Sequence, residues 1–378
     1  MNSPTTTDPA HVTAEQVVDA NQIVVETTAQ ITERLERSPL LLEARELDVT
    51  YVTEAGEVPA CRDVNLQLRR GEILGIAGES ASGKSTLLNA LSRLQRPPAV
   101  TSAGQVIFHP TDGEPVDLTA LDRDGLRRYR WNSLSIVMQS AMASLNPVMR
   151  LDSQFIDVIM EHDKSMTKKL ARERAGELLE MVGIPSSRLR SYSYQLSGGM
   201  QQRALIALSL ASNPEVVFMD EPTTAVDVVM QRQILTQILQ LQATLGFAIV
   251  FVTHDLSLLL EISDRIAIMY AGRIVEIGMP EHLFANPEHP YTRGLRASFP
   301  PLSEPVTRLE GIPGTPPDLL DLPSGCAFHP RCPLAIDRCR EERPPLVPND
   351  HGFVACHRAG EIPAPGSPVT ETTAEENR

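Results

Sequence analysis

The sequence predicts an α/β fold in which helices cover both faces of a mainly parallel sheet. Short apolar runs at 72–77, 216–219 and 248–252 suit strands that are buried on both sides. Each run is followed by a stretch whose apolar residues recur at helical spacing. Strands that alternate with helices along a chain are typical of doubly wound parallel sheets, so we expect that architecture here.

Length and composition restrict the class of protein further. The chain has 378 residues, 42% hydrophobic and 22% charged, which is typical of a globular protein with two or three compact units. Its 34 basic and 48 acidic residues give a net charge of −14, which argues against a nucleic-acid partner because such partners favour cationic surfaces. No apolar stretch approaches the ~20 residues that cross a bilayer, and no secretory signal is visible. We therefore expect a cytosolic chain that does not itself enter a membrane.

Composition also indicates how the chain divides. Residues 1–38 contain no glycine, so we predict a largely disordered N-terminal tail. A helix within 15–37, induced by a partner, is the alternative, although its apolar face is thin. The main domain is expected over 39–298, with a helical subdomain at about 140–212. Prolines multiply beyond it, which predicts an irregular C-terminal module over 299–358 and a second disordered tail over 359–378.

The elements of the main domain follow from the hydrophobic pattern. Two half-buried strands that alternate in polarity are joined by a turn at 54–57, and the first buried strand leads through a glycine-rich turn into a helix over 84–94. A further strand precedes the helical subdomain. The predicted strands lie at 45–51, 64–69, 72–77, 134–138, 216–219 and 248–252.

The glycine-rich turn carries the first chemical motif. Its sequence from Gly78 to Ser85, GESASGKS, fits the phosphate-loop pattern and stands between a strand and a helix, as the motif requires. The glycines let backbone amides face phosphate oxygens, and the helix N-terminus adds positive charge. Lys84 would then neutralise the β- and γ-phosphates, and the Ser85 hydroxyl would bind Mg²⁺. The competing interpretation is a turn that binds nothing.

Two carboxylates form the second motif. The apolar run at 216–219 ends in Asp220 and Glu221. We assign Asp220 to the coordination sphere of Mg²⁺ and Glu221 to polarising the attacking water. An acidic pair after a strand is by itself usually a solvated strand end, but a phosphate loop in the same chain favours the catalytic interpretation.

The segment from Leu196 to Arg203, LSGGMQQR, makes the combination specific. It resembles the signature sequence of the ABC ATPase family, and further marks of that family follow in the right order. Gln139 matches the Q-loop glutamine, Asp227 the D-loop aspartate and His254 the switch histidine. Tyr51 matches the aromatic residue that stacks on adenine.

This resemblance, which spans about residues 40–300, implies an ABC-type nucleotide-binding fold with a RecA-like sheet, an antiparallel β subdomain and a helical subdomain. It also implies hydrolysis of ATP, with Mg²⁺ as cofactor, at an interface with a second ABC ATPase subunit. The implied catalytic residues are Lys84, Gln139, Glu221 and His254, and the implied Mg²⁺ ligands are Ser85, Gln139 and Asp220. The implied contacts to the ATP of this chain are Tyr51, Gly78, Glu79, Ser80, Ala81, Ser82, Gly83, Lys84, Ser85 and Thr86. The implied contacts to the partner's ATP are Leu196, Ser197, Gly198, Gly199, Met200 and Gln201.

Three further segments resemble one branch of this family. They read SLNPV at 144–148, HPYTRGL at 289–295 and GCAFHPRC at 325–332, and they are similar to the ATPase subunits of dipeptide/oligopeptide (peptide/nickel) importers. The resemblance implies peptide uptake through two transmembrane permeases, with a second ATPase subunit that is identical or related, and an extracytoplasmic peptide-binding protein. It places the chain at the cytoplasmic face of the cell membrane.

Other functions stay open beside this interpretation. A member of the same family can carry nickel or another small solute. A soluble ABC ATPase of translation, DNA maintenance or cofactor assembly is a second alternative, against which the single signature sequence and the lack of a coiled-coil insertion argue. A pure interaction module would tolerate the loss of Lys84 or Glu221, and both are present.

Four cysteines stand together in the C-terminal module. Cys326, Cys332, Cys339 and Cys356 form the pattern C-x5-C-x6-C-x16-C, which suits either tetrahedral zinc or an iron–sulfur cluster, although paired CxxC motifs are absent. Three histidines lie nearby in the sequence, and four free structural thiols are the alternative. The family resemblance favours a [4Fe–4S] cluster. Cys61 stands apart and is expected to be an ordinary buried thiol.

Overall fold

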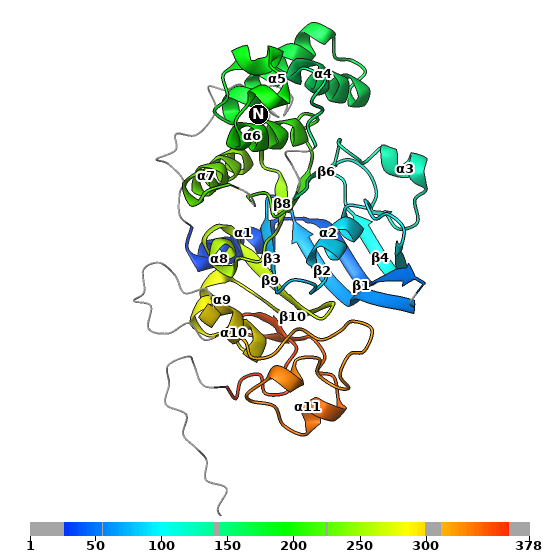
Figure 1. Ribbon diagram of the computed structural model, residues 1–378, viewed down its shortest axis with the longest axis vertical. Coiled ribbons are helices and arrows are strands. Elements are labelled where there is room, and N and C mark those ends of the chain that lie inside the picture. Colours follow the sequence, from blue (N-terminus) through cyan, green and yellow to red (C-terminus); the bar gives the residue numbers. More distant parts are fainter. Residues whose placement is uncertain (1–25, 55, 140–143, 224–225, 299–310, 363–378) are drawn as a thin grey trace, which may run out of the picture.

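The computed structural model of this chain describes residues 26–54, 56–139, 144–223, 226–298 and 311–362, and two sheets organise it (Figure 1). The larger sheet has eight strands, of which β9, β3, β8, β7 and β6 run parallel and the remaining three antiparallel. Its strands, in sheet order, are β11 (Val347–Asn349), β12 (Gly352–Val354), β10 (Arg273–Gly278), β9 (Arg265–Tyr270), β3 (Ile73–Ala77), β8 (Ala248–Val252), β7 (Val216–Asp220) and β6 (Leu134–Val137).

Three of the parallel strands confirm the prediction of strands buried on both faces. Every residue of β3, β7 and β8 is buried. Because the three strands are neighbours and parallel, their carboxyl ends meet at one edge of the sheet. The phosphate loop, the Asp220–Glu221 pair and His254 all follow directly from these ends.

The smaller sheet is antiparallel, with strand order β2-β1-β4-β5. Its first two strands have fourteen residues each, at least twice the length predicted from the alternation. The register shifts between Ala44 and Leu47, where Glu46 has a positive φ, and such an irregularity interrupts the alternation of apolar residues. The strands are β1 (Leu40–Thr53), β2 (Gly56–Arg69), β4 (Ala99–Phe108) and β5 (Val116–Asp117).

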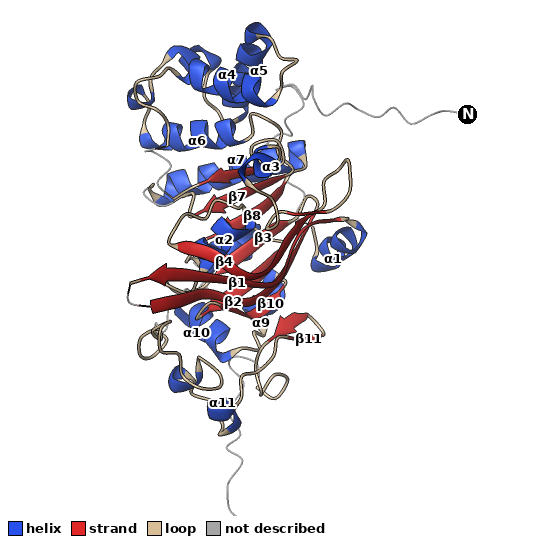
Figure 2. Cartoon of the chain, turned by 90° about the vertical axis from the view of Figure 1, so that its right-hand side faces the viewer, coloured by secondary structure: helices blue, strands red, loops and turns tan. Residues whose placement is uncertain are grey.

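Helices cover the larger sheet and gather at one end of the molecule. In both ribbon views α4, α5 and α6 lie together at that end, while α2 lies close to the sheets and α11 lies at the opposite end (Figures 1 and 2). Among the described residues no helix is both long and apolar enough to cross a membrane. The helices are α1 (Thr28–Arg37), α2 (Lys84–Leu91), α3 (Arg123–Arg127), α4 (Leu151–His162), α5 (Lys168–Met181), α6 (Gly198–Ser209), α7 (Val228–Leu245), α8 (Leu256–Ile262), α9 (Pro280–Ala285), α10 (Pro290–Ser298) and α11 (Arg338–Glu341).

The C-terminal segment is more ordered than the predicted irregular module. Its strand β12 pairs with β10 and extends the larger sheet, and β11 pairs with β12 in turn. Phe328 is buried against two aromatic rings of the main domain, with ring centroids 5.3 Å from Tyr270 and 5.4 Å from Tyr291. The segment therefore shares both the sheet and the core of the main domain.

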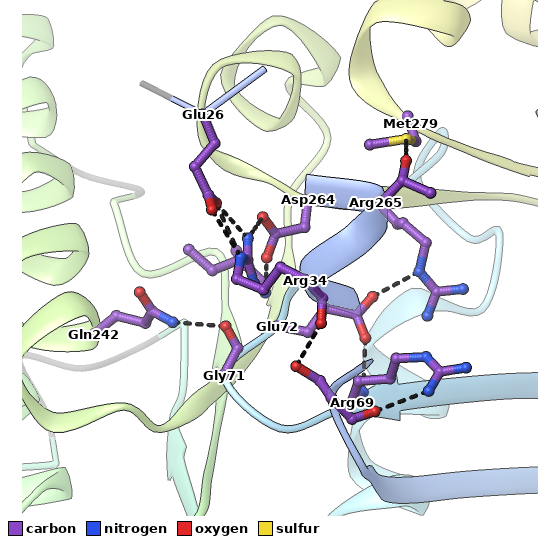
Figure 3. A network of polar contacts seen from close by, with 12 residues as sticks. Glu26, Arg34, Arg69, Gly71, Glu72, Gln242, Asp264, Arg265 and Met279 are labelled. Atoms are coloured by element: carbon purple, nitrogen blue, oxygen red, sulfur yellow. Dashed lines mark hydrogen bonds and ion pairs between the residues drawn. The ribbon is translucent and has the colours of Figure 1, made fainter. Parts of the chain in front are cut away.

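Helix α1 lies in the segment that was predicted to be a disordered tail. A capping box between Thr27 and Gln30 starts it, and Arg34 holds it to the domain through Asp264 at 2.5 Å (Figure 3). Arg34 also pairs with Glu26 at 2.9 Å. Residues 28–37 therefore form a helix, the alternative to disorder for this segment, and a buried carboxylate far along the chain supplies its partner.

Candidate nucleotide-binding site

The predicted phosphate loop lies between β3 and α2, and two glycines fix its path. Gly78 and Gly83 have φ values of +153° and +102°, in the region that favours glycine. A Cβ at Gly78 would lie 2.3 Å from the carbonyl oxygen of Met269, and one at Gly83 would lie 2.4 Å from that of Ala60. Ala81 adopts a left-handed φ of +64° despite its Cβ. The backbone therefore wraps closely against β2 and β9.

Lys84 points into the curl of this loop. Its Nζ donates to the carbonyl oxygens of Gly78 and Glu79, both at 2.8 Å, and to the Ser82 hydroxyl at 3.4 Å. Burial lowers the pKa of Lys84, whereas the carboxylates of Glu221, Asp220 and Glu79 act in the opposite direction. The loop thus holds an ammonium group where the motif predicts phosphate binding.

Two of the three predicted Mg²⁺ ligands lie in contact. The Ser85 hydroxyl donates to Oδ1 of Asp220 at 3.1 Å, and burial raises the pKa of this carboxylate, as does the neighbouring charge of Glu221. A hydroxyl and a carboxylate oxygen match the hard oxygen ligands that Mg²⁺ prefers, so the pair fits the ion. The third predicted ligand, Gln139, donates to Glu221 instead.

Two predicted catalytic residues converge on the carboxylate of a third. Gln139 Nε2 lies 2.9 Å from Oε2 of Glu221, and His254 Nδ1 lies 3.1 Å from Oε1. Glu221 has a left-handed φ of +45°, and its N–H donates to the carbonyl of Val252 in β8 at 2.9 Å. The strained turn after β7 therefore aims the carboxylate at the edge where the loops of three strands meet.

Tyr51 contacts the last residue of the predicted nucleotide contacts. Its hydroxyl lies 3.1 Å from Oγ1 of Thr86, in the first turn of α2. The half-buried ring therefore stands beside the phosphate-loop helix, although it comes from the antiparallel sheet.

The signature segment opens helix α6. Ser197 caps that helix by accepting from the N–H of Met200 at 3.3 Å, and Ser197 and Gly198 are exposed. Asp227 caps α7 in the same way, and a Cβ at Gly199 would meet the side chain of Met230 at 2.0 Å. Both ribbon views place α6 well apart from α2, so the signature does not reach the phosphate loop of its own chain (Figures 1 and 2). Residues 224–225 of the D-loop and 140–141 after the Q-loop glutamine lie outside the described residues.

Two residues at the phosphate loop had no assigned role in the sequence. Arg331 forms two hydrogen bonds to the carboxylate of Glu79, at 2.7 and 2.9 Å, and the hydroxyl of Tyr291 accepts the Glu79 N–H at 2.7 Å. Both lie in segments that resemble the importer branch, HPYTRGL and GCAFHPRC. That resemblance was their only signal, because no spacing links residue 79 to residues 291 and 331.

The four C-terminal cysteines line one small pocket, together with His329 and His357. Burial raises the pKa values of Cys326 and Cys356 to about 11. Over the described ranges, however, no three His, Cys, Asp or Glu side chains come close enough to hold a metal ion, so the predicted metal centre is not confirmed. The third nearby histidine, His351, stacks on His282 instead, with ring centroids 4.1 Å apart.

Cys61 is buried, as predicted for an ordinary structural thiol. Burial raises its pKa to about 12.

Comparisons with known proteins agree with this site. The family model for ABC transporters matches residues 61–224, and the model for the C-terminal region of oligopeptide/dipeptide transporters matches residues 275–339. A dimeric ATP-binding cassette, solved in a post-hydrolysis state with ADP and Pi bound, superposes with a TM-score of 0.56 at 28% identity. The superposition covers 64% of this chain and 99% of the cassette.

Relatives match over most of the chain. A putative peptide import ATP-binding protein of Brucella melitensis is 42% identical over 340 residues, which cover 87% of this chain and 100% of that protein. The oligopeptide transport ATP-binding protein OppD of Bacillus subtilis is 43% identical over 310 residues, 81% of this chain and 85% of OppD. The chain therefore belongs to the ATP-binding proteins of the ABC transporter family, in the branch that carries the oligopeptide/dipeptide transporter C-terminal region.

Proposed function

We propose that this chain is the ATP-hydrolysing subunit of an ABC importer and that it drives the uptake of dipeptides or oligopeptides through partner permeases. The observation that carries the proposal is the convergence of Gln139 and His254 on Glu221, in the same site as the Ser85–Asp220 pair. Two relatives are named as a peptide import protein and an oligopeptide transport protein, which supports peptides as the cargo.

The chemistry assigns a separate task to each group. Lys84 and the amides of the phosphate loop would bind the phosphates, while Ser85 and Asp220 would hold Mg²⁺, which would neutralise phosphate charge. Glu221 accepts a proton from the attacking water through a carboxylate oxygen. Gln139 and His254 each engage one of its oxygens.

Two exposed surfaces support the proposed partners, one at the signature segment and one beside the Q-loop glutamine. The exposed signature residues would meet the ATP of a second cassette, whether a copy or a related chain, and the dimeric form of the similar cassette supports this. The exposed apolar side chains of Met138 and Val148, on either side of the Q-loop segment, would face a permease helix. An extracytoplasmic peptide-binding protein would deliver the cargo, and the chain itself would sit at the cytoplasmic face of the membrane.

Reconstitution tests this function. The chain is combined in vesicles with its two permeases and the peptide-loaded binding protein, and ATP turnover is measured. Turnover should require the permeases and should rise when the loaded binding protein is added. Strong turnover that ignores every membrane component, together with association with ribosomes or DNA, would refute the transport function.

We propose the same division of the chain as the composition indicates. The ATPase unit spans 39–298, with its helical subdomain at about 140–212, and the C-terminal module spans 299–358. Helices α4, α5 and α6 fall in the helical range, which supports this division.

For the C-terminal module we propose a [4Fe–4S] cluster on Cys326, Cys332, Cys339 and Cys356, with Zn²⁺ as the alternative metal. The shared pocket of the four thiols supports it, although they would have to draw closer to bind. When bound, the group would cross-link a proline-rich segment with few apolar side chains.

Metal analysis tests this assignment. Anaerobically purified protein should contain iron and acid-labile sulfide in equal amounts, and Cys332→Ser should lose both and expose the segment to protease. Stoichiometric zinc in colourless protein would replace the cluster by zinc. A metal-free protein, with a protease-resistant Cys332→Ser variant, would leave four free thiols.

A further inference from the structure

Arg331 of the C-terminal segment contacts the phosphate loop. Arg331 ends a short 3₁₀ helix at His329–Arg331, directly before Cys332. Its Nη1 and Nη2 donate to Oε2 and Oε1 of Glu79, the second residue of the loop, at 2.7 and 2.9 Å. Two parallel bonds between a guanidinium group and a carboxylate fix direction as well as distance.

The arginine is itself held rigidly. Its side chain is only 6% exposed, and its Nε donates to the carbonyl of Pro313 at 2.8 Å. The guanidinium carbon lies 5.8 Å from the ring centre of Tyr270 and 6.0 Å from that of Phe328. Pro313 and Phe328 belong to the C-terminal segment. The position of Arg331 therefore depends on the fold of that segment.

A second contact holds the backbone of the same loop residue. The N–H of Glu79 donates to the hydroxyl of Tyr291 at 2.7 Å, and the Tyr291 side chain, from α10, is fully buried. Residues from outside the loop therefore fix both the main chain and the side chain of Glu79.

These contacts matter most when a nucleotide is bound. Lys84 Nζ donates to the carbonyl of Glu79 at 2.8 Å, so Glu79 adjoins the ammonium group that is predicted to bind phosphate. The Glu79 carboxylate is also a negative charge beside the phosphate site, where it would repel ATP if it were not paired.

We propose that Arg331 is a positioning residue for the phosphate loop, and that the C-terminal segment sets the ATP affinity of the cassette through the Arg331–Glu79 pair. The inference rests on the proposed binding of ATP at this loop. It gives the C-terminal region, which the family model matches over 275–339, a task inside the nucleotide site.

A double-mutant cycle on the full chain tests the pair. The probe is a fluorescent ATP analogue with Mg²⁺, and its Kd is measured for Arg331→Met in the wild-type and in the Glu79→Gln background. In the wild-type background we expect about tenfold weaker binding, the effect of losing a charged hydrogen-bonded partner. In the Glu79→Gln background the same change should raise the Kd by less than about twofold, because Arg331 then has no carboxylate partner in the loop. Equal loss in both backgrounds, or no loss in either, would overturn the proposal.

Further variants separate positioning from misfolding. Arg338→Met is the matched control, since Arg338 belongs to the same segment and pairs with Glu342 at 2.8 Å without contacting the loop. It should bind the analogue like the wild type. If Arg331→Met makes the segment sensitive to protease, Arg331→Lys decides the question: it keeps the charge but lacks the fork, so its Kd should lie between wild type and Arg331→Met. Wild-type affinity in the folded Arg331→Lys variant would count against the pair.

The assembled transporter supplies a second readout. Because Arg331 does not touch the reacting atoms, Arg331→Met should raise the KM for ATP while kcat changes little. Lys84→Ala separates this inference from the proposed function. If the wild-type chain binds the analogue no better than Lys84→Ala, the proposed binding of ATP at the loop is refuted. The proposed role of the Arg331–Glu79 pair is then refuted as well. If the wild type binds and Lys84→Ala does not, the cycle alone decides the role of Arg331.

Discussion

Glu221 occupies a backbone conformation that few residues with a Cβ adopt, with φ at +45°. The hydrogen bond from its N–H to Val252 in the neighbouring strand maintains this conformation. The strain places the carboxylate between Gln139 and His254, which come from the ends of β6 and β8. A residue at this position can act as a base only if its charge is retained.

We therefore expect Glu221→Gln to bind ATP normally and to hydrolyse it slowly. The amide keeps the size of the side chain but cannot accept the proton of water, and loss of one general base costs roughly a hundredfold to ten-thousandfold in rate. ATP turnover of the assembled transporter measures the effect. Glu261→Gln, which changes an exposed carboxylate on α8, is the control. Wild-type turnover in Glu221→Gln would refute the assignment of the base.

His289 predicts a pH dependence of stability. Burial lowers its pKa to about 3, so the folded chain keeps this imidazole neutral while the unfolded chain protonates it below about 6.5. Stability should therefore fall as the pH drops from about 6.5 towards 3. His289→Asn, which keeps an acceptor for the Tyr291 N–H, should show a shallower fall in Tm between pH 6.5 and 5.

The neighbouring Glu276 acts in the opposite direction. Burial raises its pKa to about 7, so its contribution is lost as the pH rises from about 4.5 to 7. Thermal melts give the difference in Tm between His289→Asn and the wild type at each pH. Because both proteins keep Glu276, this difference reports the contribution of His289. Parallel curves for the two proteins would contradict the prediction. His254→Asn controls for the loss of an exposed imidazole.

At the scale of elements, the sequence predicted strands best where burial is uniform. The strand β8 was predicted at its observed limits because every residue of Ala248–Val252 is apolar and buried. The strands β1 and β2 were predicted too short, since irregularities near Glu46 and Asp63, both with positive φ, break their alternation. Helix α1 was left as an alternative to disorder, because its partner, Asp264, lies 230 residues further along the chain and the sequence does not indicate that contact.

Helix α1 should contribute measurably to stability through that partner. Arg34→Met would leave Asp264, whose carboxylate is largely buried and also accepts from the N–H of Ile73, without its cation. We expect a loss of about 1–3 kcal/mol in the free energy of unfolding, below the cost for a fully buried pair because Arg34 is partly exposed. Urea denaturation measures it.

Arg37→Met provides the matched control on the same helix. Arg37 is 78% exposed and pairs with Glu33, so its loss should change stability by less than about 0.5 kcal/mol. Equal effects of the two substitutions would show that α1 does not depend on Asp264.

At the scale of the whole molecule, the predicted catalytic residues and the signature segment lie in different parts of the structure. The motifs predicted both sets of residues, and the side chains of Gln139, Glu221 and His254 meet as their order in the family implies. The contact of Arg331 with Glu79 was not predictable, because it joins residues 252 positions apart and leaves no periodicity in the sequence. Distant pairs of this kind become visible only when the fold is known.

The separation of the two sets predicts the behaviour of Ser197→Arg. The isolated chain should bind ATP like the wild type, because its own phosphate loop is untouched. In the assembled transporter, turnover should fall by about a hundredfold at the composite site that uses this signature, the usual cost of removing a preorganised donor. Binding and turnover assays on the same preparation check both parts. Weakened ATP binding by the isolated chain would contradict this division of the site.

The addition of β12 to the edge of the larger sheet has a consequence for synthesis. The phosphate loop leaves the ribosome early, but β12 and Arg331 follow more than 250 residues later, and long-range contacts of this kind form late. A nascent chain therefore carries a loop whose Glu79 is unpaired until the C-terminal segment has emerged. Premature termination would release a cassette that keeps its catalytic carboxylate yet lacks its anchor. The proposed role of Arg331 thus predicts full nucleotide affinity only after the C-terminal segment has been synthesised.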